Sequence, residues 1–164
     1  MKTSKSLCVL LVAVLTVASA FASTVSSVDL GLTVGASRNF ALSQDHGYVV
    51  DGPSLGMQSC INMERCSIVV AGSLTTNTEI FVFDASVTLR RTARMNLSFS
   101  FLIESGVAAR LVSSQSVDAA VLCRSGIRYS VLSNMDLSVI AGVRLLSSGA
   151  IGVDASVGGS YRFG

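Results

Sequence analysis

The chain has 164 residues, of which 50% are hydrophobic and only 13% are charged. Soluble protein surfaces usually carry roughly 25 to 35% charged residues, so a chain this poor in charge is not expected to face water on every side. Its only lysines are Lys2 and Lys5. The arginines and the acidic residues are equal in number, so the formal charge beyond the two lysines is zero. This neutrality excludes a strongly basic surface, and nucleic acid is therefore not expected as a partner.

The first residues predict export. Two lysines precede an apolar run over residues 7–17, which is too short to span a bilayer as a helix. Ala20 and Ala22 have the spacing of a signal peptidase site with cleavage before Ser23, and a second possible site lies two residues earlier. Residues 1–22 are therefore predicted to be a secretory signal peptide for the Sec pathway, and the remainder suffices for one domain.

The residues that follow predict strands. Hydrophobic side chains alternate with small or polar ones along residues 28–39, which is the two-residue period of a β-strand. Between Phe81 and Phe163, twelve of the thirteen charged residues occupy even positions, a bias that helices would not produce. The eight predicted strands cover residues 28–39, 67–74, 79–90, 95–103, 107–112, 117–131, 135–145 and 151–163.

The only long predicted connection is 41–66. It contains Cys60 and Cys66, which enclose five residues and are predicted to form a disulfide in an oxidising compartment. A metal site is the disfavoured alternative, because only Glu64 and the distant His46 could add ligands. Neither a metal nor another cofactor is expected.

The last predicted strand carries a resemblance to a known class. Residues 151–163 alternate throughout and end in Tyr161-Arg162-Phe163, followed by Gly164. This ending resembles the final strand of bacterial outer-membrane β-barrels, in which a C-terminal aromatic residue is the tag read by the barrel-assembly machinery. With the signal peptide and the strand rhythm, the chain resembles the small eight-stranded barrels that include outer membrane protein A transmembrane domains, opacity adhesins and attachment-invasion proteins.

The resemblance implies an all-β fold, an eight-stranded antiparallel up-and-down transmembrane β-barrel formed by residues 23–164. Its N-terminus is expected in the periplasm, which makes 41–66 the first extracellular loop. The polar face of the strands contains mainly Ser, Gly, Thr and Asp with isolated Arg, whereas a soluble barrel would present long charged side chains there. We therefore expect the polar face to line a crowded interior.

The lumen is predicted to be plugged by ion pairs and not to conduct solutes, since eight strands leave room only for side chains. Arg128 is expected to pair with Asp136, and Arg144 with Asp154, across neighbouring strands. The charged residues assigned to the lumen are Asp29, Asp84, Glu104, Arg110, Asp118, Arg124, Arg128, Asp136, Arg144, Asp154 and Arg162.

The opposite face is predicted to meet lipid. Cys123 lies on it, and so do seven aromatic residues that the predicted strand directions bring to the periplasmic boundary. Aromatic girdles are typical of membrane interfaces, whereas β-propensity alone would scatter the rings. The predicted girdle consists of Phe81, Phe83, Phe99, Phe101, Tyr129, Tyr161 and Phe163.

Four arginines are predicted to form a surface at the extracellular side. Arg90, Arg91 and Arg94 fall at the second predicted extracellular connection, and Arg38 lies near the top of the first strand. They could bind lipopolysaccharide phosphates or an anionic host polysaccharide, and a solvated loop is an equally open interpretation.

Members of the class mostly stabilise the envelope or bind host surfaces through their loops, so the same is expected here. The expected partners are outer-membrane lipid, lipopolysaccharide, the barrel-assembly machinery and a host surface ligand. The first alternative is an outer-membrane lipid-modifying enzyme, because Ser43, Asp45 and His46 are residue types of a catalytic triad, although no oxyanion donor can be assigned. The second is a secreted soluble ligand-binding β-barrel.

Overall fold

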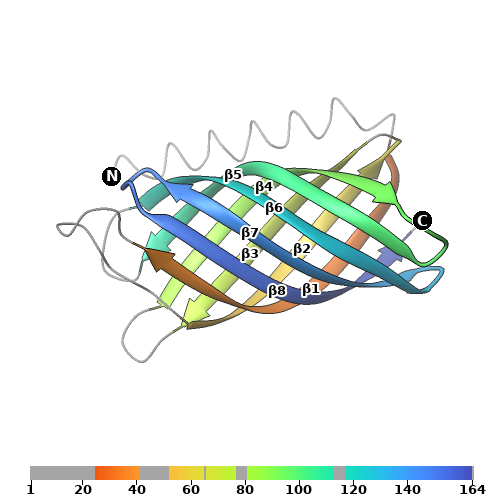
Figure 1. Cartoon of the computed structure of the whole chain (residues 1–164), viewed down its shortest axis with the longest axis horizontal. Coiled ribbons are helices and arrows are strands. Elements are labelled where there is room, and N and C mark those ends of the chain that lie inside the picture. Colours follow the sequence, from red (N-terminus) through yellow and green to blue (C-terminus); the bar gives the residue numbers. More distant parts are fainter. Residues whose placement is uncertain (1–24, 41–51, 65, 77–80, 113–116, 164) are drawn as a thin grey trace.

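The computed structural model describes residues 25–40, 52–64, 66–76, 81–112 and 117–163. They form one closed barrel of eight antiparallel strands in chain order, in which β1 also pairs with β8 (Figure 1). The strands are β1 (Val25–Phe40), β2 (Gly52–Met63), β3 (Ser67–Thr76), β4 (Phe81–Arg94), β5 (Phe99–Val112), β6 (Val117–Leu132), β7 (Met135–Leu146) and β8 (Ile151–Phe163). The predicted all-β, eight-stranded antiparallel barrel is confirmed.

The prediction that residues 41–66 form one loop is wrong, because β2 lies inside it. Its outward positions carry Leu55, Met57 and Ile61, but Pro53 and two glycines weaken the strand signal in the sequence. Pro53 is tolerated because it is the second residue of the strand, where few ladder hydrogen bonds are lost. Pairing with β1 and β3 supplies the stability that local propensity does not.

The prediction of separate strands over 95–103 and 107–112 is also wrong, because one strand, β5, runs through both. The gap between the two predicted strands contains Glu104 and Gly106, but both residues point into the barrel and pair with Arg90 and Thr88 of β4. The two errors cancel in the strand count. Because of these errors, however, the predicted directions of β3, β4 and the first half of β5 are opposite to the observed ones.

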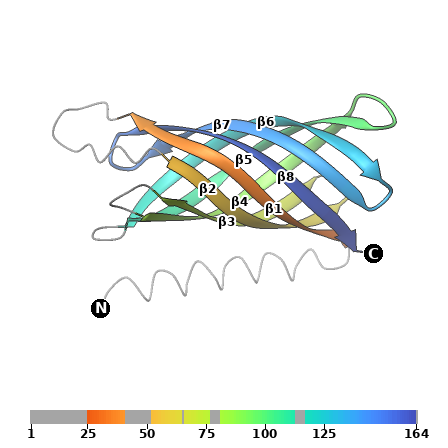
Figure 2. The ribbon, with the colours of Figure 1, turned by 90° about the horizontal axis from the view of Figure 1, so that it is seen from below.

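The barrel has two distinct ends. At the terminal end, β1 begins and β8 finishes, together with the turns after β2, β4 and β6 (Figure 2). The loop end carries the other four connections, of which the structure describes only 147–150. The terminal end is the expected periplasmic side and the loop end the expected extracellular side.

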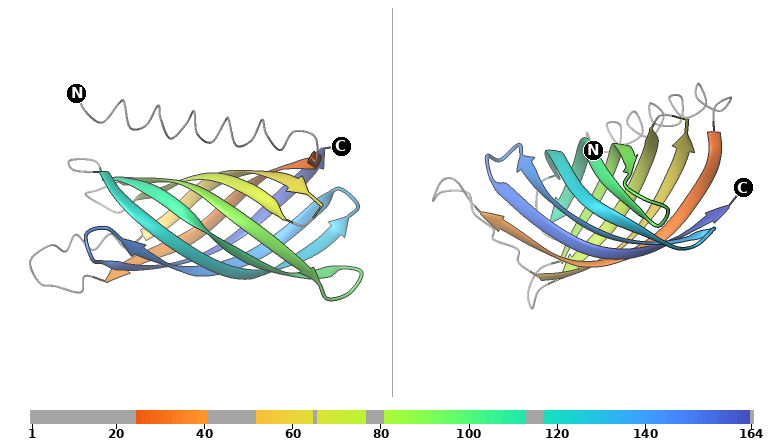
Figure 3. Two further views of the ribbon diagram at one scale, coloured as in Figure 1. Left: turned by 90° about the horizontal axis from the view of Figure 1, so that it is seen from above. Right: turned by 45° about the vertical axis from the view of Figure 1, so that its right-hand side comes forward.

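The strands are strongly tilted to the barrel axis (Figure 3). The stagger is found by going around the barrel from Thr33 of β1 to β6, from each residue to its paired residue on the next strand. The path through β2, β3, β4 and β5 reaches β6 at Asp118, whereas the path in the other direction, through β8 and β7, reaches it at Arg128. These positions on β6 are ten residues apart, which is the stagger with which the sheet closes. As a result, residues from non-neighbouring strands, such as Asp84 of β4 and Arg144 of β7, meet inside the barrel.

The two faces have the predicted parity. Leu, Val, Ile, Met and Phe side chains are exposed on the outer surface, whereas carboxylates and guanidinium groups are buried inside. This distribution is the reverse of a soluble protein and is that of a membrane barrel. No helix of the described residues is long and apolar enough to cross a membrane.

Glycines at inward positions let the interior pack closely. A Cβ on Gly142 would lie 2.9 Å from the Cα of Arg124 on the neighbouring strand and would overlap the Arg124 side chain. The outward Gly72 differs, because a Cβ there would only touch the Phe83 ring at 3.4 Å. Inward glycines therefore make room for the charged side chains.

Candidate functional site

The lumen holds two groups of ion pairs. The loop-end cluster consists of Asp84, Arg110, Arg124, Arg144 and Asp154. Asp84 Oδ2 accepts a hydrogen bond of 2.8 Å from Arg144 Nη1, and Asp84 Oδ1 lies 3.7 Å from Arg110 Nε. Asp154 lies 3.2 Å from Arg124 Nε and 3.5 Å from Arg144 Nη2. Arg144 also donates to Ser37 Oγ at 3.2 Å, so it joins β7 to β4, β8 and β1.

The terminal-end cluster consists of Asp29, Arg90, Glu104, Arg128, Asp136 and Arg162. In its lower part, Arg162 Nε donates to Asp29 Oδ1 at 3.2 Å, and Arg162 Nη2 donates to Asp136 Oδ2 at 3.0 Å. Arg128 Nη1 lies 3.6 Å from Asp136 Oδ2. Ser130 Oγ completes the group by donating to Asp136 Oδ1 at 2.7 Å.

The remainder of this cluster is a deeply buried pair. Arg90 Nε donates to Glu104 Oε1 at 2.6 Å, and no more than 4% of either side chain is exposed. Arg90 also donates to Gln58 Oε1 at 3.3 Å and contacts Cys60 Sγ at 3.8 Å, which ties β4 to β2 across the intervening strand. Buried charges are costly without partners, so these contacts are what permits a charged interior.

Both predicted cross-strand pairs, Arg128 with Asp136 and Arg144 with Asp154, are confirmed. Asp118 is half-buried at the loop end, opposite Arg110, and accepts a hydrogen bond of 3.3 Å from Ser147 Oγ. All eleven charged residues assigned to the lumen thus have lumen-facing positions. Arg90 also lies in the lumen, although it was predicted to belong to the extracellular arginine surface. Its even number, shared with the other lumen residues of β4, was the available signal.

The predicted arginine surface does not form. Arg38 faces outward at the loop end of β1, whereas the other three arginines lie near the terminal end of β4. Arg90 is buried in the lumen, Arg91 faces outward, and Arg94 donates to the carbonyl oxygens of Asn96 and Leu97 at 3.1 and 3.4 Å. Because β4 runs opposite to the predicted direction, these three arginines lie at the other end of the barrel from Arg38.

Five of the seven predicted girdle residues lie toward the terminal end. Phe99 and Tyr129 pack with ring centroids 4.8 Å apart, and Tyr161 and Phe163 do so at the same distance. Phe101, the fifth, is also on the outer surface there. Phe81 and Phe83 are at the loop end instead, because β4 begins there, and their assignment to the same ring was wrong.

The predicted disulfide is not formed, since both Cys60 and Cys66 are free thiols. Cys60 belongs to β2 and points into the lumen, where its Sγ donates to Asn62 Oδ1 at 3.3 Å, whereas Cys66 lies in the turn before β3. Cys123 is exposed on the outer surface, as predicted.

Other predicted features fall outside the described residues. They are the signal peptide 1–22, the triad candidates Ser43, Asp45 and His46, and Gly164. Among the residues that the structure describes, no group of three His, Cys, Asp or Glu side chains could hold a metal ion.

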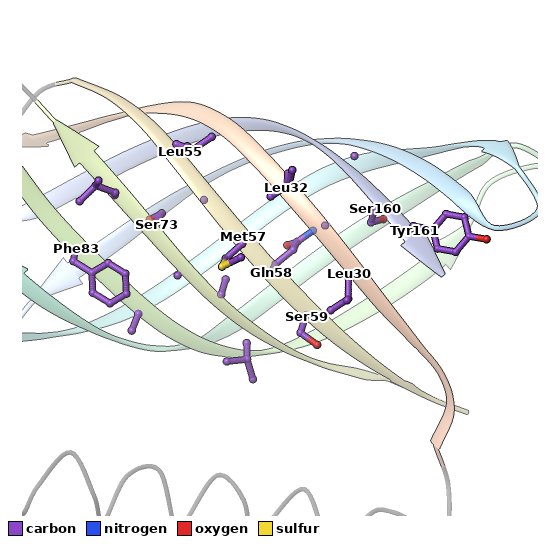
Figure 4. A pocket seen from close by; sticks show the side chains of 18 of the residues that line it. Leu30, Leu32, Leu55, Met57, Gln58, Ser59, Ser73, Phe83, Ser160 and Tyr161 are labelled. Carbon is purple, nitrogen blue, oxygen red and sulfur yellow. The ribbon is translucent and has the colours of Figure 1, made fainter. Parts of the chain in front are cut away.

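The outer surface over β1–β4 and the end of β8 has an apolar hollow (Figure 4). Leu30, Leu32, Leu55, Met57 and Phe83 line it, and Gly72 deepens it because it has no side chain. This hollow continues the apolar surface of the barrel, and its composition suits contact with lipid acyl chains.

No family model matches the sequence, and no curated protein matches it. Solved structures do share its shape. Neisserial surface protein A superimposes with a TM-score of 0.72 at 9% identity, over 83% of this chain and 97% of that one. The attachment invasion locus protein Ail of Yersinia pestis gives 0.63 at 12% identity, over 84% and 98% of the chains. The N-terminal β-barrel domain of Pseudomonas aeruginosa OprF gives 0.61 at 10% identity, over 82% and 97%. The chain therefore has the fold of the small eight-stranded outer-membrane β-barrels.

Proposed function

We propose that this protein is a structural component of the bacterial outer membrane, an envelope barrel that is not an enzyme and does not conduct solutes. The observation that carries this proposal is the filled lumen, in which paired charges and fully buried side chains such as Leu102 and Val82 occupy the interior. An apolar outer surface around a packed charged interior suits a stable membrane anchor.

The placement in the membrane follows from the same features. The chain would be exported by the Sec pathway, recognised by the barrel-assembly machinery through Phe163, and inserted with its terminal end in the periplasm. The aromatic residues at that end would then lie where the periplasmic face of the outer membrane meets water. They are Phe99, Phe101, Tyr129, Tyr161 and Phe163. Its immediate partners would be outer-membrane lipid and lipopolysaccharide.

A second role, adhesion to a host surface ligand, has support of a different kind. The fold neighbour Ail is named as an attachment protein, and one of its structures contains the heparin analogue sucrose octasulfate. In this chain, however, Arg91 and Arg94 lie at the end opposite Arg38, so the arginines do not build an anion-binding surface at the loop end. Adhesion would depend on the loop residues themselves.

Location and closure are tested together by electrophoresis of an outer-membrane fraction in dodecyl sulfate, unheated and boiled. A closed barrel is expected to stay folded in cold detergent and to change its mobility on boiling. Recovery from the soluble periplasm or medium would contradict the proposal and would favour the secreted ligand-binding barrel. Reconstitution in planar bilayers is expected to give no steady, large conductance.

The role is tested in a deletion strain. If the barrel is structural, the deletion strain should take up more of a hydrophobic dye than the parent strain. Expression of the wild-type protein should return dye uptake to the normal level. A variant whose residues 43–50 are replaced by a Gly-Ser segment of the same length should do so equally well. If only surface binding is lost on deletion, and the loop variant does not restore it, adhesion is the role. The same variant lacks Ser43, Asp45 and His46, so loss of a lipid modification would instead identify the enzyme.

A further inference from the structure

We propose that the terminal end of the barrel binds the phosphate of an anionic phospholipid, and that Arg91 of β4 is the residue that holds this phosphate. The inference rests on the membrane role proposed above, and it adds the class of lipid and the place where that lipid binds. Three observations carry it: the charge of the outer face, the unused donors of Arg91, and the apolar surface around them.

The outer face has a positive charge that the lumen does not compensate. The lumen is neutral, because six carboxylates and six guanidinium groups point inward. They belong to Asp29, Asp84, Glu104, Asp118, Asp136 and Asp154, and to Arg90, Arg110, Arg124, Arg128, Arg144 and Arg162. On the described strands only two charged side chains point outward, those of Arg38 and Arg91. Glu64, exposed in the turn after β2, forms no ion pair with a described residue. An anionic partner therefore complements the outer face.

The two outward arginines differ in what they contact. Arg38 already takes part in an interaction within the protein, whereas Arg91 forms no hydrogen bond or ion pair with any described residue. Arg94, three residues farther along β4, uses Nε and Nη2 to hold the carbonyl oxygens of Asn96 and Leu97. A guanidinium group has five N–H donors in a planar fork that matches two oxygens of a phosphate. At the terminal end, Arg91 is thus the outward cation with donors available.

The neighbours of Arg91 place its guanidinium at the level of lipid headgroups. Leu89 precedes it on the outer face of β4, and Ile103 is its partner on β5. The next outward residue toward the terminal end, Ala93, pairs with Phe101 of the aromatic girdle. A long cationic side chain in this position lays its stem on the apolar surface and extends its charge to the membrane–water boundary. Phospholipid phosphates lie at that boundary.

The turn between β4 and β5 favours a lipid over a soluble anion. Met95 and Leu97 are 66% and 86% exposed there. The turn is held in place, because Asn96 Oδ1 accepts hydrogen bonds from the backbone N–H groups of Ser98 and Phe99 at 2.9 and 2.7 Å. Apolar side chains on a fixed turn beside the girdle can pack between lipid molecules. A second copy of this chain is disfavoured as the occupant, because two positive faces would repel each other.

Native mass spectrometry in detergent tests the lipid preference. With phosphatidylglycerol and phosphatidylcholine supplied in equal amounts, the anionic lipid is expected to be bound several-fold more often. Arg91→Gln should reduce this ratio to the composition of the mixture. Arg38→Gln, which removes the other outward arginine, is the matched control and should keep the wild-type ratio. An equal ratio for the wild type, or an Arg91→Gln variant that keeps the preference, would overturn the proposal.

Two competitors separate the lipid from other anions. Inorganic phosphate in excess should not displace phosphatidylglycerol, because it lacks the acyl chains that contact the apolar surface. Displacement by a soluble oligoglutamate peptide would identify an acidic protein segment as the partner and would also overturn the proposal. Unheated and boiled gel samples show whether each variant is folded. A folded barrel in the outer membrane without the lipid preference contradicts only this inference, whereas recovery from the soluble periplasm contradicts the membrane role as well.

Discussion

The two lumen clusters use the same side-chain types but differ in how completely they are paired. In the terminal-end cluster, Asp136 receives contacts from Arg128, Arg162 and Ser130, and the only buried polar atom without a partner is Asp29 Oδ2. The loop-end cluster leaves Nε of Arg144 and Oδ1 of Asp154 without a hydrogen bond beside a cavity. The terminal end of the lumen is thus a closed plug, whereas the loop end is less completely hydrogen-bonded and contains a cavity.

The largest expected effect is in the closed plug. Glu104→Gln would leave Arg90 charged and buried without its carboxylate, at a cost on the order of 3 to 5 kcal/mol of unfolding free energy. Urea unfolding of the protein in lipid vesicles, followed by gel mobility, measures this loss. The double variant Arg90→Met/Glu104→Leu serves as the control, and should be more stable than Glu104→Gln because no unpaired charge remains. A double variant less stable than the single one would contradict this account.

The next effect concerns the packing around the loop-end cluster. Gly142→Ala would place a methyl group against the Arg124 side chain and the neighbouring backbone, and is expected to cost about 1 to 3 kcal/mol as overpacking. Gly72→Ala is the matched control, since its methyl group would point outward to the Phe83 ring. Equal unfolding midpoints for the two variants would show that the inward face has more room than the structure indicates.

A smaller difference is expected between two arginine variants that sharpen the comparison directly. Arg162→Gln removes contacts to both Asp29 and Asp136, whereas Arg124→Gln removes one contact and leaves two arginines facing two aspartates. Arg124→Gln should therefore be the more stable variant, by about 1 kcal/mol, a typical net value for hydrogen bonds to partly exposed groups. The reverse order would mean that the loop-end cluster is the more completely paired one.

The smallest perturbation probes access to the plug. Cys60 is 1% exposed and is surrounded by the terminal-end cluster, so its thiol should not react with a maleimide until the barrel unfolds. Cys123, on the outer surface, should react in detergent and be protected from a water-soluble maleimide in vesicles. Mass spectrometry after labelling distinguishes the two sites. Rapid labelling of Cys60 in the folded protein would show that water reaches the plug.

The sequence by itself determined the two faces of the barrel. The two-residue period assigned the lumen charges, the outward position of Cys123 and the bounds of β8, because alternation is a local property that burial on one face enforces. It also determined the pairs Arg128–Asp136 and Arg144–Asp154, since short hairpins fix the register between consecutive strands.

Only the tertiary structure decided the direction of β3 and β4 and the contacts across the lumen. β2 has little strand propensity of its own and is held by pairing with β1 and β3, so its omission from a sequence-based prediction placed Arg91, Arg94, Phe81 and Phe83 at the wrong ends. The contact of Arg144 with Asp84 depends on the stagger with which the sheet closes. Closure is a property of the whole barrel, and no local pattern encodes it.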